Sequence, residues 1–184
     1  MEDVQFPEHA QGTSGEATNP LDDQRYSQEP DPKRPKLTNK PQPRPRSLII
    51  YGASKLGKTI WARSLGRHHY FNRQFGTAQM VDDAEYAVFD DMDRGLLGFD
   101  YKAWMGGQNQ FSIVDKYISP RTVYWNKPVI VLMNDDEYQR NKASTKLDKD
   151  WINANCIIVN LNGRRLASMN IPFIDTLIDI GEKM

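Results

Sequence analysis

Residues 52–59 carry glycines, a lysine and a threonine at a spacing that could hold a phosphate group. The stretch GASKLGKT fits the pattern G-x-x-x-x-G-K-[ST]. In such a loop the backbone amides converge on phosphate oxygens, and the amino end of the following helix adds partial positive charge. Lys58 would reach the β- and γ-phosphates of ATP, and Thr59 would bind Mg²⁺. The expected cradle consists of Gly52, Ala53, Ser54, Lys55, Leu56, Gly57, Lys58 and Thr59.

Two adjacent acids could supply the next requirement, because hydrolysis needs one carboxylate near Mg²⁺ and another to orient water. Asp90 and Asp91 follow the apolar run of residues 86–89. We assign Asp90 to the Mg²⁺ shell and Asp91 to polarising the attacking water. The alternative is an ordinary acidic turn.

Asn134 ends a third apolar run, Val129 to Met133. An amide at this place could donate to the γ-phosphate and position water without adding negative charge. Asparagine also caps turns after strands, so the residue alone would not separate the two roles. Its position after the phosphate loop and the acids favours catalysis, and the three elements together predict NTP hydrolysis.

The elements that must position these groups are strands, loops and helices in alternation. Residues 48–51 form a short apolar run of the kind found in buried parallel strands, and residues 60, 61, 64 and 65 repeat at helical spacing after the loop. Ligands bind at the carboxyl edge of such sheets. We therefore predict an α/β fold with a mainly parallel sheet flanked by helices. Between the acids and Asn134, paired glycines and alternating apolar residues suggest a hairpin with Lys116 near its tip; by composition this lysine is a solvated surface charge.

The first part of the chain differs from the rest in composition. The chain has 184 residues with equal numbers of basic and acidic residues, 24 each. Residues 1–46 contain eight of the eleven prolines and few large apolar residues, and their charge changes from acidic to basic. We predict a disordered tail over 1–46 and one domain over 47–184, whose net charge is only +1. A domain of this charge could bind nucleic acid only through a few focused side chains.

The basic patch PKRPK at residues 32–36 resembles a nuclear import signal, although a solvated linker or a loose nucleic-acid contact would have the same composition. We find neither a membrane span nor a secretory leader and expect a protein that is not secreted. Cys156 is the one cysteine and is expected to be a core thiol. His68 and His69 are expected at the end of the helix after the phosphate loop, where neighbours diverge too far to share a metal.

Five stretches in this order and spacing resemble the superfamily 3 helicase domain of replication-associated (Rep) proteins from small circular single-stranded DNA viruses, above all genomoviruses and geminiviruses. They are YGASKLGKTIWARSLGRHHYF, YAVFDDM, WMGGQNQFSIVDKY, PVIVLMN and DWINANC, within residues 47–160. The resemblance implies an AAA+-like P-loop ATPase with Walker A at 52–59, Walker B at Asp90 and Asp91, motif B′ around Lys116 and motif C at Asn134. It also implies a ring, usually hexameric, with ATP between subunits and the B′ hairpins gripping single-stranded DNA. Copies of Lys116 around one channel would reconcile DNA binding with the near-neutral domain.

Two features depart from the family pattern. Full-length Rep proteins carry a nicking endonuclease domain ahead of the helicase, and residues 1–46 are too few to contain it. We expect such a domain or protein to be a partner rather than part of this sequence. Several relatives also have an arginine finger within the segment matching DWINANC, where this chain has Asn153 and Ala154. Arg140, Arg164 and Arg165 are the nearest substitutes, and residues 171–178 are expected to form an amphipathic C-terminal helix.

The sequence therefore favours an ATP-dependent DNA helicase part of a rolling-circle replication initiator acting in the host nucleus. One alternative is a nucleotide-dependent interaction protein that binds ATP and other subunits without unwinding DNA. A second is a P-loop kinase for a small metabolite. Such kinases close an arginine-rich lid over the phosphates, and residues 134–150 contain only Arg140.

Overall fold

The computed structural model describes residues 44–115 and 118–166. Three predictions lie outside these residues: the tail over 1–46 except for its last three residues, the position of Lys116, and the C-terminal helix over 171–178. All of the described residues belong to one compact unit of the chain.

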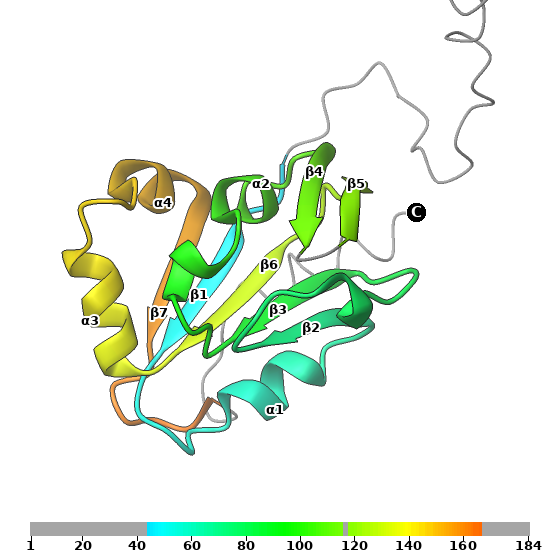
Figure 1. Ribbon diagram of the computed structural model, residues 1–184. Coiled ribbons are helices and arrows are strands. Elements are labelled where there is room, and N and C mark those ends of the chain that lie inside the picture. Colours follow the sequence, from blue (N-terminus) through cyan, green and yellow to red (C-terminus); the bar gives the residue numbers. More distant parts are fainter. Residues whose placement is uncertain (1–43, 116–117, 167–184) are drawn as a thin grey trace, which may run out of the picture. The chain divides into compact units, whose positions relative to one another are not determined.

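A five-stranded, fully parallel sheet forms the centre of the fold (Figure 1). The strand order is β2-β3-β6-β1-β7, so β2 and β3 are neighbours in the sequence as well as in the sheet, whereas the other pairs join strands that are far apart along the chain. The strands are β1 (Ser47–Tyr51), β2 (His68–Asn72), β3 (Tyr86–Asp90), β6 (Val129–Met133) and β7 (Cys156–Asn160). The three apolar runs that sequence analysis predicted as strands are β1, β3 and β6, and the predicted mainly parallel α/β sheet is confirmed.

Short helices connect and cover the strands. The α-helices are α1 (Lys58–Arg63), α2 (Tyr101–Met105), α3 (Asp135–Ala143) and α4 (Lys149–Asn155), and the 3₁₀ helices are η1 (Thr77–Gln79) and η2 (Gly95–Gly98). Asp100 and Asp148 cap α2 and α4, because their carboxylates accept hydrogen bonds from the free amides of the first turn. Within the described residues, no helix has the length and apolar composition needed to cross a membrane.

Both faces of the sheet are buried, which explains why its central strands are apolar without alternation. On one face Leu48 and Ile50 of β1 pack with Ala62 of α1 and with Leu161 and Leu166, which follow β7. The opposite face carries a larger, aromatic-rich cluster under η2, α2, α4 and the hairpin of β4 (Gln110–Asp115) and β5 (Ile118–Tyr124). Its buried members include Ile49, Phe71, Phe89, Trp104, Trp125, Val131, Met133 and Ile152.

The predicted hairpin is present as β4 (Gln110–Asp115) and β5 (Ile118–Tyr124), which pair antiparallel. Ile113 and Val123 are buried in the aromatic-rich cluster, so one face of the hairpin is anchored to the domain. The pairing shifts register between Ile113 and Asp115, next to the two residues that the structure does not describe. Lys116, which was predicted near the tip of the hairpin, is one of these two residues.

The prediction that His68 and His69 end the helix after the loop is wrong, because both lie on β2. α1 ends at Arg63, before the helical repeat through residue 65 is complete. The chain then turns back through residues 64–67 and pairs with β3. Consecutive residues of a strand point to opposite faces, so the two imidazoles still diverge.

The His69 imidazole and the Cys156 thiol are polar groups buried on the aromatic-rich face of the sheet. Burial raises the pKa of Cys156 to about 12, in agreement with the predicted core thiol. His69 stacks on Trp125, and its Nδ1 accepts a hydrogen bond of 3.0 Å from the Val81 amide. Burial, followed by the positive charge of Lys127, lowers the pKa of His69 to about 4 from 6.5.

We expect this buried imidazole to make the domain less stable in mild acid. The unfolded chain binds a proton near pH 6.5, whereas the folded chain does so only near pH 4, so unfolding is favoured as pH falls between these values. From pH 7 to pH 5 this effect amounts to about 2 kcal/mol. Urea unfolding at the two pH values measures it. A His69→Gln variant should lose this part of the pH dependence, and an unchanged slope in that variant would contradict the prediction.

Candidate nucleotide-binding site

The carboxyl ends of three neighbouring strands bring the predicted site residues together. β1 lies between β6 and β7, and β3 lies on the other side of β6. In the register of the sheet, Tyr51 is opposite Met133 and Asp90 is opposite Leu132, so the three loops leave the sheet at the same level. Figure 1 shows these loops at one edge, with the start of α1 beside them. This is the edge at which open α/β sheets bind ligands.

The predicted phosphate loop between β1 and α1 needs its two glycines for different reasons. A Cβ atom on Gly52 would lie 2.9 Å from Leu161, so a side chain there would collide with the segment that follows β7. Gly57 adopts a left-handed conformation, with φ of 85°, immediately before α1. The segment after β7 also holds the loop through backbone hydrogen bonds. The Leu161 amide donates to the Tyr51 carbonyl, and the Leu166 amide donates to the Leu56 carbonyl. Residues 161–166 therefore pack against the loop and hold its backbone in place.

Lys58 lies at the first position of α1 and points back into the loop. Its Nζ donates to the carbonyl oxygens of Gly52 at 2.7 Å and Ala53 at 2.9 Å, and to Asn134 Oδ1 at 3.2 Å. Burial lowers the pKa of this ammonium group, and the nearby carboxylates of Asp91 and Asp90 act in the opposite direction. A buried cation held by neutral oxygens is well placed to exchange these carbonyl partners for phosphate oxygens.

Asp90 and Thr59 form the part of the site that could hold a divalent cation. The Thr59 hydroxyl donates to Asp90 Oδ2 at 2.9 Å, and Asp90 is almost fully buried. A hydroxyl and a carboxylate are oxygen ligands, which Mg²⁺ prefers. The residues present therefore fit the predicted metal. The described residues contain no cluster of three or more His, Cys, Asp or Glu side chains that could hold a metal ion by themselves.

Asp91 and Asn134 face each other across the neighbouring strands. Asn134 Nδ2 donates to Asp91 Oδ1 at 3.2 Å, while Asn134 Oδ1 accepts from Lys58 and from the Ser54 hydroxyl at 3.3 Å. Asp91 has a left-handed backbone, with φ of 45°, which turns the chain away from β3. Partial burial and the charge of Asp90 raise the pKa of Asp91. Asn134 thus connects the acid predicted to polarise water to the lysine predicted to bind phosphate.

Sequence analysis missed Tyr70 and Glu137. Tyr70 lies on β2 and donates from its hydroxyl to Asp90 Oδ2 at 2.8 Å; burial, followed by this hydrogen bond, raises its pKa to about 12. Glu137 is buried in the first turn of α3, and its Oε1 has no hydrogen-bond partner among the described residues. Burial, followed by the charge of Asp91, raises the pKa of Glu137 to about 7. The spacing of Asn134 and Glu137, which matches a capping box, could have indicated the second residue.

The three candidate arginine fingers lie on exposed positions of two elements. Arg140 is on α3, where its guanidinium lies 3.9 Å from the Asp136 carboxylate. Arg164 and Arg165 belong to the segment that supports the phosphate loop. A finger acts on the site of a neighbouring subunit, so the choice among these residues stays a prediction.

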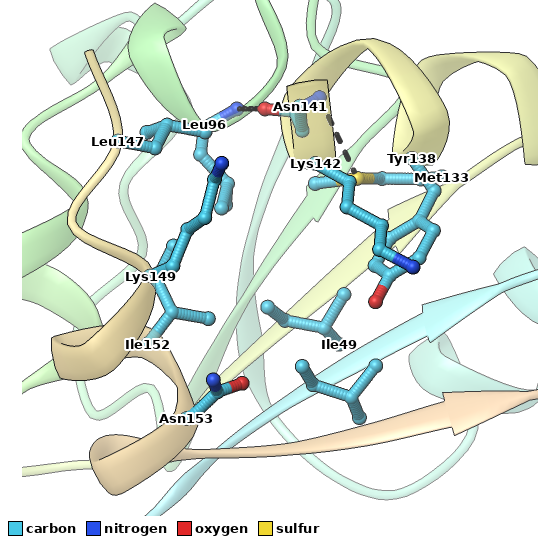
Figure 2. Close-up of a pocket in the computed structure, with 11 residues that line it drawn as sticks. Ile49, Leu96, Met133, Tyr138, Asn141, Lys142, Leu147, Lys149, Ile152 and Asn153 are labelled. Atoms are coloured by element: carbon cyan, nitrogen blue, oxygen red, sulfur yellow. Dashed lines mark hydrogen bonds between the residues drawn. The ribbon is translucent and has the colours of Figure 1, made fainter. Parts of the chain in front are cut away.

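A pocket of about 150 Å³ lies elsewhere, on the aromatic-rich face between the sheet, α3 and α4 (Figure 2). Ile49, Met133 and Ile158 belong to its sheet side, and Lys142 and Lys149 also line it. The residues that line it do not include the predicted phosphate or metal ligands. Its volume is below the roughly 300–1,000 Å³ typical of small-molecule sites. It is therefore separate from the predicted nucleotide site.

No protein-family model matches the chain. The chain is 37% identical over 115 residues to the replication-associated protein of Miscanthus streak virus, a match that covers 62% of this chain and 30% of that protein. The chain is homologous to part of the geminivirus Rep proteins.

Two further Rep proteins give the same result. The protein of Tobacco yellow dwarf virus is 38% identical over 112 residues, covering 60% of this chain and 32% of that protein. The protein of Maize streak virus genotype C is 36% identical over 120 residues, covering 62% and 32%. The chain thus matches about a third of the length of these Rep relatives. The homology confirms the predicted resemblance to geminivirus Rep proteins.

Proposed function

We propose that this chain is the ATP-dependent helicase part of a viral rolling-circle replication initiator. It hydrolyses ATP as a subunit of a ring, usually hexameric in the family, and moves along single-stranded DNA. One observation carries the proposal: five residues predicted from three separate stretches form hydrogen bonds at one sheet edge. Thr59 is bonded to Asp90, and Asn134 is bonded to both Lys58 and Asp91. Homology to Rep proteins supports DNA replication as the setting.

Each of these residues has a definite part in the proposed chemistry. Lys58 exchanges the carbonyl oxygens of Gly52 and Ala53 for the β- and γ-phosphates and balances their charge. Thr59 and Asp90 hold Mg²⁺, which neutralises charge on the phosphate oxygens when it is bound. Asp91 accepts a hydrogen bond from the attacking water. Asn134, fixed between Asp91 and Lys58, keeps water and phosphate in line.

The proposed DNA contact is at the β4–β5 hairpin. The buried side chains of Ile113 and Val123 fix the strands of the hairpin to the domain. Lys116 lies between the two strands in the sequence, and its structure lies outside the described residues. Several copies of one lysine around a channel would form a local positive ring in a domain whose net charge is only +1.

We expect Lys116→Ala to weaken binding to single-stranded DNA, to reduce its salt dependence and to abolish stimulation of ATP hydrolysis by DNA. Each subunit loses a phosphate contact, whereas Lys116 is not part of the phosphate loop, so hydrolysis without DNA should persist. The measurement is a salt titration of a labelled oligonucleotide with a non-hydrolysable nucleotide present, together with ATPase assays. Lys146→Ala is the control, because it removes an exposed lysine between α3 and α4.

Three other results would change the proposal. If neutralising Lys33, Arg34 and Lys36 removes all DNA binding while Lys116→Ala removes none, the tail holds the DNA. If the chain binds ATP and associates but DNA never stimulates turnover, the interaction-protein alternative replaces the helicase. Stimulation by a small metabolite instead of DNA would favour the kinase.

The basic patch at residues 32–36 and the Rep homology also support import into the host nucleus, where a nicking endonuclease domain or protein would be the partner. Fusing residues 1–46 to a fluorescent protein and following its location tests the import signal.

A further inference from the structure

Tyr70 reaches the site from β2, the strand next to the one that carries Asp90. β2 and β3 pair in parallel with Tyr70 opposite Val88 and Asn72 opposite Asp90. This register carries the Tyr70 side chain toward the end of β3, where its hydroxyl donates to Asp90 Oδ2 at 2.8 Å. β2 therefore supplies a side-chain contact to the carboxylate as well as backbone pairing.

The carboxylate of Asp90 has two hydroxyl donors on the same oxygen. Thr59 donates to Oδ2 at 2.9 Å and Tyr70 donates to it at 2.8 Å. In the proposed function the Thr59 hydroxyl is also a ligand of Mg²⁺, so its contact with Asp90 changes when the metal binds. Tyr70 has no part in phosphate or metal binding and can keep its bond. It is therefore the donor that can fix the orientation of Asp90 in both states.

Tyr70 is itself held in place from the phosphate-loop helix. The guanidinium of Arg63, the last residue of α1, lies 4.1 Å from the centre of the Tyr70 ring. Such a cation–π contact holds the tyrosine ring against the end of α1. The backbone around Asp90 is fixed separately, because the Arg73 amide and the Asn72 amide group both donate to the Asp90 carbonyl, at 3.0 and 3.4 Å. The backbone contacts thus fix the carbonyl of Asp90, and Tyr70 contacts its carboxylate.

We propose that Tyr70 is a positioning residue that holds the Asp90 carboxylate in the orientation needed to bind Mg²⁺, and that Arg63 holds Tyr70. The inference rests on the proposed function, because it takes Asp90 as part of the metal site. A tyrosine that acts through the orientation of Asp90 affects Mg²⁺ and leaves the phosphate contacts of the loop unchanged.

The test is nucleotide binding by the full chain at increasing Mg²⁺, with a fluorescent ATP analogue as the probe. Tyr70→Phe keeps the ring and its contact with Arg63 but removes the hydroxyl. We expect the Mg²⁺ concentration for half-maximal binding to rise about 10-fold, the lower end of the loss for partners that orient metal ligands. Binding measured in EDTA should be unchanged.

Tyr86→Phe is the matched control. It also removes a tyrosine hydroxyl from the central sheet, but that hydroxyl donates to the Ala62 carbonyl at 2.7 Å, away from Asp90. We expect its Mg²⁺ midpoint to equal that of the wild type. Arg63→Met removes the cation–π contact with Tyr70 by a change at an exposed position on α1. This variant should raise the Mg²⁺ midpoint by a smaller factor, about two- to three-fold.

Each other outcome counts against a defined part of the inference. An unchanged Mg²⁺ midpoint in Tyr70→Phe overturns it, as does an equal loss of binding with Mg²⁺ and in EDTA. An unchanged midpoint in Arg63→Met removes the role of Arg63 alone. If wild-type binding does not depend on Mg²⁺, the proposed metal site itself is wrong, which distinguishes failure of the proposed function from failure of this inference.

Discussion

Replacing Lys58 with alanine is expected to reduce ATP turnover by at least about 10²-fold, the scale of losing one preorganised donor that stabilises charge. Lys58 is buried at the start of α1, and its ammonium group is bound to the carbonyls of Gly52 and Ala53 and to Asn134. The loop therefore holds the positive charge in place before nucleotide arrives. Steady-state phosphate release measures the change.

Lys146 provides the control for that experiment, because it is an exposed lysine between α3 and α4, outside the predicted phosphate loop. We expect Lys146→Ala to retain turnover within a few-fold. A Lys58→Ala protein that folds and hydrolyses ATP at the wild-type rate would remove the loop from the mechanism.

The site residues that could be predicted from sequence are those that come directly after a continuous run of apolar residues. Residues 48–51, 86–89 and 129–133 are apolar on both faces because the sheet is covered on both sides. The end of such a strand is visible as the end of its apolar run, so Asp90, Asp91 and Asn134 could be placed at the carboxyl edge by sequence pattern alone. The hydrogen bonds that connect them depend on the strand order, which that pattern does not contain.

Residues on the edge strand β2 could not be found in this way. The sequence HHYFN alternates between partly buried and buried positions and has little apolar character, so it did not stand out as a strand. The six-residue α1 is also shorter than its helical repeat suggested, and Ile60, which that repeat placed with the apolar residues, is 80% exposed. Pairing with β3 makes HHYFN a strand despite this composition. Tyr70 therefore became visible as a site residue only once the strand order was known.

Asp91→Asn is expected to separate nucleotide binding from hydrolysis. Asparagine has nearly the same size, can accept the hydrogen bond from Asn134 through its own Oδ1, and tolerates the left-handed backbone at this position. It lacks the charge that polarises water, so hydrolysis should fall by about 10²-fold or more. The affinity for Mg²⁺ and nucleotide should stay within a few-fold, because Asp90 and Thr59 are unchanged.

Asp90→Asn is the comparison that assigns the two acids. Asp90 is buried and accepts hydrogen bonds from both Thr59 and Tyr70 on one oxygen, so removing its charge should weaken Mg²⁺-dependent nucleotide binding as well as hydrolysis. Equilibrium binding and single-turnover hydrolysis of the two variants, measured side by side, separate these effects. If affinity collapses in Asp91→Asn while Asp90→Asn is the milder change, the two roles are reversed. Asp91 would then hold the metal, and Asn134, which donates to it, would orient a metal ligand instead of the attacking water.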